Sequence, residues 1–330
     1  MPEELHALSD SKFFSPLHKS ISNRTGSLGR KYALIRRDIK ELSIKSLWFV
    51  CAAFCIVVTF FIFTFLVKDG YQIFTTVGLG NFIGGNVWNP TGTAPSYGTF
   101  PLIVGTILVT IGAMVVAVPL SIAGAIYVAE LASPRAKAMI KPAIELLAGI
   151  PSVVYGFFGL IVLTDWLRTT FNLASGETWL AGSILLGIMA LPTILSISED
   201  AISAVPREYR EGSLGLGANR WQSIRGVVLP AALSGITAAI ILGMGRAIGE
   251  TMAVLMVVGN AAIIPSPITN IFSPIRTLTG TLGIEMGEVP VGSAHYHALF
   301  GVALVLLVIT LLVNISATLI LGKIKEMQMP

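Results

Sequence analysis

The run GMGRAIGETMAV, residues 243–254, places two ionisable side chains, Arg246 and Glu250, among residues that are otherwise apolar or small. A charged side chain is costly inside a membrane and, where it occurs, faces a helix bundle or a water-filled path. Four residues of helix separate the two by about 6 Å along the axis and place them on one face. Gly245 and Gly249 beside them let another backbone approach closely. Two interpretations stay open: an ion pair that locks two helices together, or a guanidinium whose paired donors bind an oxyanion.

The composition indicates that these residues lie in a membrane protein. The chain has 330 residues, of which 54% are hydrophobic and 12% charged, and its mean hydropathy is +0.79. Soluble domains carry about 25% charged residues. A helix needs about 20 apolar residues to cross the hydrocarbon core. Six segments meet this requirement and predict an all-α polytopic fold, at residues 46–67, 99–130, 140–163, 180–198, 231–263 and 297–321.

Two of these segments contain signals against a straight helix. The third includes AGIPSVVYGFFG, in which Pro151 and three glycines predict irregular backbone. Such backbone is tolerated in a membrane only against protein or a water-filled path. The fourth contains Pro192, where we predict a second break. The fifth, 231–263, reads as one helix with Arg246 near its centre.

The distribution of basic residues predicts the orientation. Residues 1–45 form a basic tail, which we expect to face anionic lipid in the cytoplasm and not nucleic acid. Loops on the far side of the predicted spans carry only Lys68, Arg168 and Arg276. The positive-inside rule therefore places both termini in the cytoplasm and the chain in the cytoplasmic membrane. The basic residues on the tail's side, beyond the tail itself, are Arg135, Lys137, Lys141, Arg207, Arg210, Arg220, Arg225, Lys323 and Lys325.

Patterns for enzymatic chemistry are missing from the sequence. It contains no G-x-x-x-x-G-K-[ST], G-x-G-x-x-G, H-E-x-x-H or G-x-S-x-G. We therefore predict no catalytic residue and no nucleotide site in this chain. Cys51 and Cys55 are interpreted as small apolar residues of the first span. His295 and His297 lack a third ligand, so we predict no metal site and a solvated loop there.

The segment between the fourth and fifth spans, residues 207–235, predicts a helical hairpin. Glu208, Arg210 and Glu211 favour a first short helix, and three glycines break it. Trp221 and Ile224 indicate a second short helix with an apolar face. Pro230 then opens the next span. The glycines are Gly212, Gly215 and Gly217.

This hairpin resembles the loop of ABC importer permeases, in which E-A-A precedes G, I and L-P at fixed distances. Glu211, Gly212 and Ser213 stand at the E-A-A positions, Gly217 is the glycine, Val227 replaces the isoleucine, and Leu229 and Pro230 close the pattern. Further stretches resemble the phosphate-specific (Pst) permeases, and VWNP with the long loop before the last span favours the C-type subunit. The stretches are AVPLSIAGAIYVAEL (117–131), AGIPSVVYGFFG (148–159), GRAIGETMAV (245–254) and VWNP (87–90).

The resemblance implies a type I ABC importer transmembrane domain that imports phosphate. The hairpin then forms the coupling helix that contacts a separate ABC ATPase dimer, which binds ATP and Mg, so no cofactor is expected in this chain. A second related permease subunit is implied as the heterodimer partner, and a phosphate-binding protein as the extracytoplasmic one. Loops 68–98 and 264–296 are either simple connectors or its landing surface. Arg246, Glu250 and Thr251 are assigned to the substrate path, with Glu250 holding Arg246 when no anion is present.

The predicted organisation has four parts: a tail at 1–45, a first helix with its loop at 46–98, the permease domain at 99–321 with its coupling loop at 199–230, and a short tail at 322–330.

Three alternatives for the function stay open. The nearest is a permease for another oxyanion, such as molybdate or sulfate. The others are an ion-driven secondary transporter or channel, and a membrane scaffold or receptor without transport.

Overall fold

The computed structural model describes residues 15–328 and consists mainly of helices. The chain divides into two compact units, residues 1–65 and 66–330. Helix α1, Ser15–Thr76, begins in the first unit and ends in the second. Its apolar part, Glu41–Thr76, is long enough to span a membrane and contains the predicted segment 46–67. The predicted tail 1–45 is thus helical from Ser15, and its residues 1–14 lie outside the described part.

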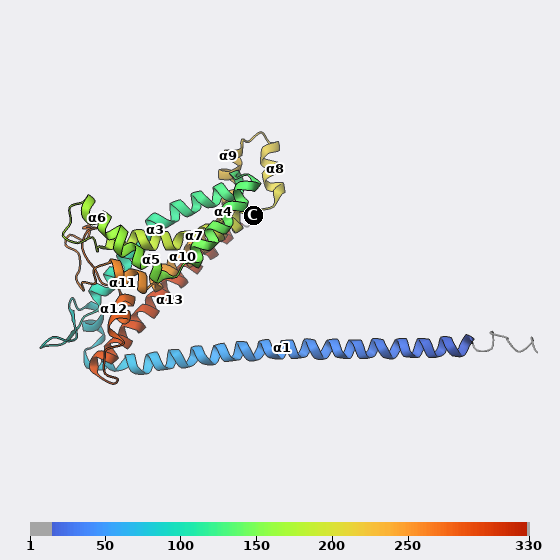
Figure 1. Ribbon diagram of the computed structural model, residues 1–330, viewed down its shortest axis with the longest axis horizontal. Coiled ribbons are helices and arrows are strands. Elements are labelled where there is room, and N and C mark those ends of the chain that lie inside the picture. Colours follow the sequence, from blue (N-terminus) through green and yellow to red (C-terminus); the bar gives the residue numbers. More distant parts are fainter. Residues whose placement is uncertain (1–14, 329–330) are drawn as a thin grey trace, which may run out of the picture. The chain divides into compact units, whose positions relative to one another are not determined.

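The second unit is built on four long helices, of which α3 packs along α7 and α7 along α10 (Figure 1). Small and branched apolar residues fill the contacts, among them Ala117, Ala190, Ile194 and Ala239. Among the described residues, the helices that qualify as spans number five, or up to six with one bent pair. The four long helices of this unit are α3 (Phe100–Ile126), α7 (Trp179–Ser203), α10 (Leu229–Gly249) and α13 (Ala294–Gln328).

The bent pair is the predicted third span. Helix α4, Pro134–Gly149, and the helical segment Ser152–Thr170 meet at 89° across Ile150 and Pro151. The Tyr155 hydroxyl donates to the Leu147 carbonyl oxygen at 2.9 Å and bridges the break. The predicted irregular backbone is confirmed. The second arm consists of α5 (Ser152–Phe158), the π-helical turn η2 (Gly159–Leu163) and α6 (Thr164–Thr170).

The predicted break at Pro192 is wrong, because α7 continues through this residue to Ser203. A proline removes one backbone hydrogen bond from a helix, but neighbouring helices can compensate in a packed bundle. Here α7 packs along α3 and α10, and Ser121 Oγ of α3 donates to the Leu191 carbonyl oxygen at 3.1 Å, which ties α7 to α3 one residue before Pro192. Tertiary packing therefore holds the helix where local preference predicts a break.

The predicted helix 231–263 is also wrong, because α10 ends at Gly249 and Glu250 has extended backbone. A short helix, α11 (Met252–Val257), follows. The Glu250 carbonyl oxygen accepts a hydrogen bond from Thr279 Oγ1 at 2.9 Å instead of one from the next helical turn. Glycines at 243, 245 and 249 lower the helical preference of this stretch, which makes the break cheap.

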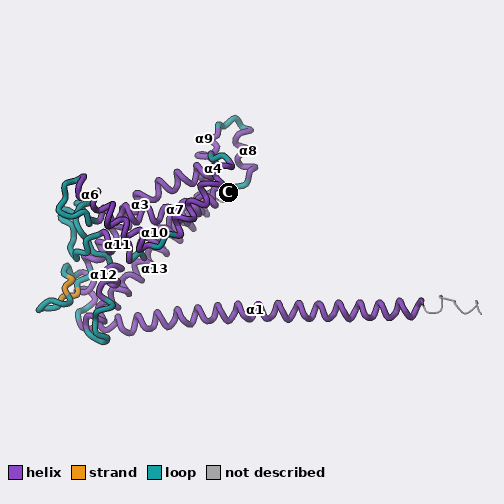
Figure 2. The backbone as a smooth tube through the Cα atoms, viewed as in Figure 1, coloured by secondary structure: helices purple, strands orange, loops and turns teal. Residues whose placement is uncertain are grey.

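One end of the second unit, here called the loop end, consists of residues 77–99, 164–178 and 258–293. It holds α2 (Leu79–Gly84), the paired strands β1 (Trp88–Asn89) and β2 (Ser96–Tyr97), and α12 (Leu278–Glu285) (Figure 2). These segments are not open connectors. They share a hydrophobic core with the ends of α1 and α13, which includes Ile73, Phe82, Trp88, Leu102, Leu278, Ala298 and Leu299.

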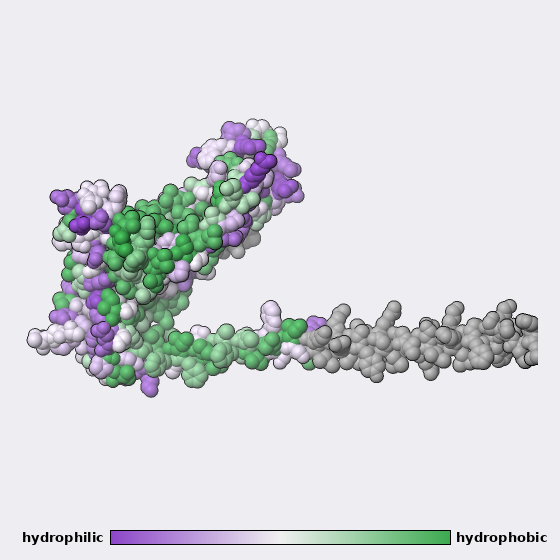
Figure 3. Space-filling model, viewed as in Figure 1, coloured by the Kyte–Doolittle hydropathy of each residue, from purple (hydrophilic) through white to green (hydrophobic). Residues whose placement is uncertain are grey.

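The opposite end, here called the hairpin end, consists of residues 132–141 and 203–228. Its helices are α8 (Arg207–Gly215) and α9 (Arg220–Ser223), flanked by the π-helical turns η1 (Tyr127–Leu131) and η3 (Ile224–Val228). On the face that Figure 3 presents, hydrophobic side chains cover the middle of this unit and hydrophilic ones gather at both ends. This distribution is typical of a protein whose middle lies in a bilayer.

Candidate functional site

Arg246 lies in the last turn of α10, one turn before the helix ends. Its Nη1 donates to Thr193 Oγ1 of α7 at 3.0 Å, and its side chain is half-buried. Among the described residues, no carboxylate lies within ion-pair distance of this guanidinium. Its remaining N–H groups are therefore available to an oxyanion that reaches this depth.

Glu250 does not pair with Arg246. Because α10 ends at Gly249, the two residues do not share a helical face, so the predicted ion pair is not formed. Glu250 instead stands before α11, where its Oε1 accepts from the backbone N–H of Ala253 at 3.4 Å. Thr251 lies beside α12, since a Cβ at Gly283 would come within 2.7 Å of the Thr251 methyl group. The break thus replaces a helix-locking pair with an unpaired guanidinium next to irregular backbone.

The two broken helices meet at this site. Helix α5 packs against α11, and a Cβ at Gly156 would come within 2.9 Å of Ala253 Cα. A Cβ added at Gly245 or Gly249 would meet no atom within 4 Å, so no other element of the described residues packs against these two glycines. Ser152 and the predicted path residue Thr251 are half-buried near these breaks. Tyr155 is buried, and its hydroxyl is used by the Leu147 carbonyl.

The hairpin is the second part of the candidate site, and its turn is a Schellman motif. Helix α8 ends at Gly215, and Gly217 has a φ of +89°. The N–H of Gly217 donates to the Leu214 carbonyl oxygen at 2.9 Å, and that of Ala218 to the Ser213 carbonyl oxygen at 3.1 Å. A residue with a Cβ is strained at this φ, which explains the glycine of the motif. Gly212 and Gly215, predicted to break α8, lie inside it.

The return arm of the hairpin is fixed by a capping box. Asn219 Oδ1 accepts from the Gln222 N–H at 2.9 Å, and Gln222 Oε1 accepts from the Asn219 N–H at 2.8 Å. Ser213 Oγ and Ser223 Oγ, 2.5 Å apart, join the two arms. Ile224 packs inward while Trp221 is exposed, so the two do not form the common apolar face that the sequence predicts.

The other motif residues lie along the two arms. Glu211 and Gly212 are exposed on α8, where Ser213 Oγ donates to the Arg210 carbonyl oxygen at 2.9 Å. Val227 and Leu229 are half-buried on the return arm, and Pro230 stands in the first turn of α10, as predicted. All of them belong to one continuous hairpin.

At the loop end, Glu285 gathers three donors. It pairs with Arg276 Nη1 at 2.7 Å and with His295 Nε2 at 2.8 Å, and it accepts from Trp88 Nε1 at 3.2 Å. His297 Nδ1 lies 3.0 Å from the Asp69 carbonyl oxygen. The two histidines therefore stand in packed positions at the start of α13, and the predicted solvated loop is wrong. No group of three potential metal ligands occurs among the residues that the structure describes.

Sequence reasoning missed the partners of the charged residues. Thr193 gave no signal, because an isolated threonine in an apolar helix is ordinary. Glu199 stands one residue beyond the predicted span 180–198, beside Asp200, whereas Glu130 is the last residue of the predicted span 99–130. Glu130 could have been found by applying the cost of a buried charge to every predicted span, but Glu199 could not, because it was assigned to the coupling loop.

Comparison with solved structures shows the fold. The chain of the structure "Inward facing conformations of the MetNI methionine ABC transporter: CY5 SeMet soak crystal form" matches with a TM-score of 0.50 and 18% identity, over 68% of this chain and 94% of that one. The second unit therefore has the fold of an ABC transporter membrane subunit, as predicted. Residues 121–326 match the family model described as "Binding-protein-dependent transport system inner membrane component". The chain belongs to this family.

Curated relatives agree with this family. The chain is 43% identical over 279 residues to the "Probable ABC transporter permease protein YqgH" of Bacillus subtilis (strain 168), over 84% of this chain and 89% of that protein. It is 36% identical to the "Phosphate transport system permease protein PstC" of Mesorhizobium japonicum, over 78% of this chain and 83% of that protein. For the protein of the same name from Pasteurella multocida, the values are 34%, 80% and 86%.

Family membership decides between the classes left open by the sequence. The chain is a multi-pass inner membrane component of a binding-protein-dependent transport system, which is a transport subunit and not an enzyme. A substrate-binding protein and an ATPase are partners of such a component, so these two predicted classes of partner are confirmed. The secondary transporter and the scaffold without transport are excluded.

Proposed function

We propose that this chain is one of two membrane subunits of an ATP-driven phosphate importer. The observation that carries the proposal is Arg246, a half-buried guanidinium with a hydroxyl partner, Thr193, and no described carboxylate partner. Phosphate crossing a low-dielectric path needs compensating positive charge, and the planar fork of an arginine matches two phosphate oxygens. Relatives at 34% and 36% identity are named phosphate transport system permease proteins, which supports phosphate as the anion.

The neighbours of Arg246 complete the proposed path. Thr193 positions the guanidinium, and Glu250 and Thr251 line the break that follows α10. A carboxylate close to an anion path weakens anion binding, which permits release on the other side. The G-x-x-x-G face of Gly245 and Gly249, open in this chain, is the face that the second, related permease covers in the heterodimer.

The hairpin couples this chain to the ATPase that powers transport. Its exposed apolar residues Leu216 and Trp221 and the motif residue Glu211 contact the ATPase dimer, which holds ATP and Mg, and this chain needs no cofactor of its own. The hairpin end and both termini face the cytoplasm, as the basic residues indicate. A phosphate-binding protein docks at the loop end, on residues of 68–98 and 264–296.

The test is uptake by vesicles that contain the complete complex. Labelled phosphate is offered with and without ATP and is challenged with sulfate, molybdate and arsenate. Uptake that needs ATP and that sulfate and molybdate do not suppress supports the proposal. Competition by molybdate or sulfate stronger than by unlabelled phosphate assigns the path to that oxyanion instead.

The decisive variant is Arg246→Ala, which we expect to reduce uptake at least about a hundredfold, since it removes the charge that the anion meets. Assembly and membrane insertion are expected to survive. Arg168→Ala is the matched control, because Arg168 forms an exposed pair with Asp165 at 2.7 Å and its loss is expected to leave uptake unchanged. Loss of the assembled complex in Arg246→Ala, or normal uptake in Arg246→Met, assigns the arginine a structural role.

A further inference from the structure

Two charged clusters meet on residues 199–205, at the end of α7. The first joins α7 to the hairpin through Arg210 of α8. Its Nη2 donates to the Ile202 carbonyl oxygen at 2.8 Å, and its Nη1 donates to the Val205 carbonyl oxygen. The same guanidinium pairs with Glu130 Oε1 of η1, at 2.7 Å from Nη2 and 2.9 Å from Nε. One side chain thus ties the hairpin to the ends of both α7 and α3.

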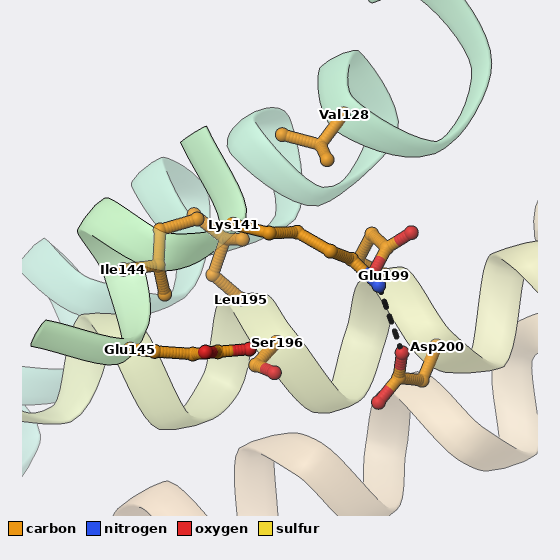
Figure 4. Close-up of a pocket in the computed structure, with 8 residues that line it drawn as sticks. All are labelled: Val128, Lys141, Ile144, Glu145, Leu195, Ser196, Glu199 and Asp200. Carbon is orange, nitrogen blue, oxygen red and sulfur yellow. Dashed lines mark hydrogen bonds and ion pairs between the residues drawn. The ribbon is translucent and has the colours of Figure 1, made fainter. Parts of the chain in front are cut away.

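The second cluster joins α7 to α4 through Glu199. This carboxylate is 1% exposed, and each of its oxygens takes one lysine of α4: Lys137 Nζ lies 2.6 Å from Oε1 and Lys141 Nζ 2.6 Å from Oε2. Ser203 Oγ donates to Oε1 at 2.9 Å. Figure 4 shows Lys141 reaching across from α4 to Glu199, with a further contact to Asp200 at 3.5 Å.

Because their charges are buried, the ion pairs of both clusters are costly to separate. A carboxylate enclosed by protein is costly without its counter-charges, so α4 cannot leave the end of α7 without exposing or neutralising Glu199. Glu130 and Arg210 are also mostly enclosed, with 13% and 21% of their side chains exposed. The Arg210 cluster therefore connects the hairpin to the end of α7, and the Glu199 cluster connects the end of α7 to α4.

The far end of α4 lies at the break of the third span. Tyr155 of α5 bonds Leu147 of α4 across that break, and Gly156 lets α5 contact α11 closely. Helix α11 follows the break after α10, one helical turn beyond Arg246. A series of contacts thus leads from the hairpin to α11, which the chain joins to Arg246 through the break after α10.

We infer that residues 199–205, at and just beyond the end of α7, form a transmission junction, in which Arg210 and Glu199 are positioning residues that pass movement of the hairpin to α4 and to the break beside Arg246. The inference rests on the proposed function, since it names how ATPase movement reaches that path. Neither residue touches the anion. Their contribution is expected in the ratio of transport to ATP hydrolysis, where a merely structural role has no effect.

The experiment uses the complete complex in proteoliposomes with its ATPase and binding protein, and measures phosphate uptake and ATP hydrolysis in the same preparation. In Glu199→Gln and in Arg210→Gln, the rate of ATP hydrolysis is expected to stay within about twofold of the wild-type rate. Uptake per ATP is expected to fall about tenfold, which is a typical size for the coupling between two sites. Glu145→Gln is the matched control, for which the ratio should not change. Glu145 is exposed one helical turn after Lys141 on α4, and with Lys141 and Glu199 it lines the pocket drawn in Figure 4.

A triple variant keeps the inference testable if Glu199→Gln alone prevents assembly of the complex. The triple variant Lys137→Gln, Lys141→Gln and Glu199→Gln leaves no buried charge without a partner, because Asp200, which loses Lys141, is 68% exposed. The same loss of uptake per ATP is expected. Equal loss of uptake and hydrolysis, or a ratio equal to that of Glu145→Gln, overturns the inference. If the wild-type complex transports a different oxyanion, the phosphate assignment is refuted. The transmission junction can still be tested, because uptake per ATP is then measured with that oxyanion.

Discussion

The hairpin end and the loop end of this permease use polar, glycine-containing segments in opposite ways. At the loop end, segments far apart in sequence bury their large apolar residues in a common core, and Leu278 is 0% exposed. At the hairpin end, Leu216 is 92% exposed and Trp221 also faces outward. The hairpin keeps its shape through local devices, which are the Schellman turn at Gly217 and the capping box of Asn219 and Gln222.

The difference gives the two ends different surfaces. The loop end is held by its own core and by the Glu285 cluster, so it presents a prefolded polar surface. The hairpin buries few of its apolar side chains in its own fold, so Leu216 and Trp221 remain exposed, as the proposed ATPase contact requires. A rigid backbone with exposed apolar residues suits an element that transmits movement.

The largest expected effect on stability is a difference between replacing a buried leucine at the loop end and replacing an exposed leucine at the hairpin end. Leu278→Ala removes a fully buried side chain and should lower the free energy of unfolding of the loop end by about 2–5 kcal/mol. Leu216→Ala should change it by less than about 0.5 kcal/mol. Apparent melting temperatures of the solubilised protein, followed by tryptophan fluorescence, measure both. Equal shifts would contradict the contrast between the two ends.

The next effect concerns Glu285. Replacing it with glutamine leaves Arg276 without its carboxylate and should cost about 1–3 kcal/mol, since the pair is mostly enclosed, with 14–15% of each side chain exposed. Glu288→Gln is the control, because Glu288 is exposed and forms no ion pair with a described residue. Limited proteolysis within 258–293 measures the loosening. If both variants are cleaved at the same rate, Glu285 does not hold this end together.

The smallest effect on stability, and the one most specific to coupling, is expected at Gly217. Gly217→Val forces a branched residue to a φ of +89° and should cost the turn about 1–2 kcal/mol. The amount of ATPase that co-purifies with the membrane subunits should fall. Gly226→Ala is the control, because Gly226 lies in η3 without a positive φ and meets nothing within 4 Å. Undiminished ATPase binding in Gly217→Val would show that the turn's geometry is not required.

Much of the fold follows from local sequence. Runs of apolar residues located every span, Pro151 marked the bent pair, and Gly217 marked the turn of the hairpin. The misplaced features share one cause. Pro192 predicted a break that packing against α3 and α10 overrides, and an apolar run through 250–263 predicted a helix that a distant threonine interrupts. The pairing of Arg246 with Glu250 was wrong because it assumed that helix.

By itself, the sequence determined that this is a polytopic membrane protein with an importer hairpin, since hydropathy, glycine positions and the 211–230 pattern are properties of short stretches. Only the tertiary structure decided which charges meet. Thr193 lies 53 residues from Arg246, Thr279 lies 29 residues from Glu250, and Glu130 lies 80 residues from Arg210. The physical reason is that burial is assigned by the whole bundle: a charge is held by whichever group the packed helices bring to it, at any distance along the chain.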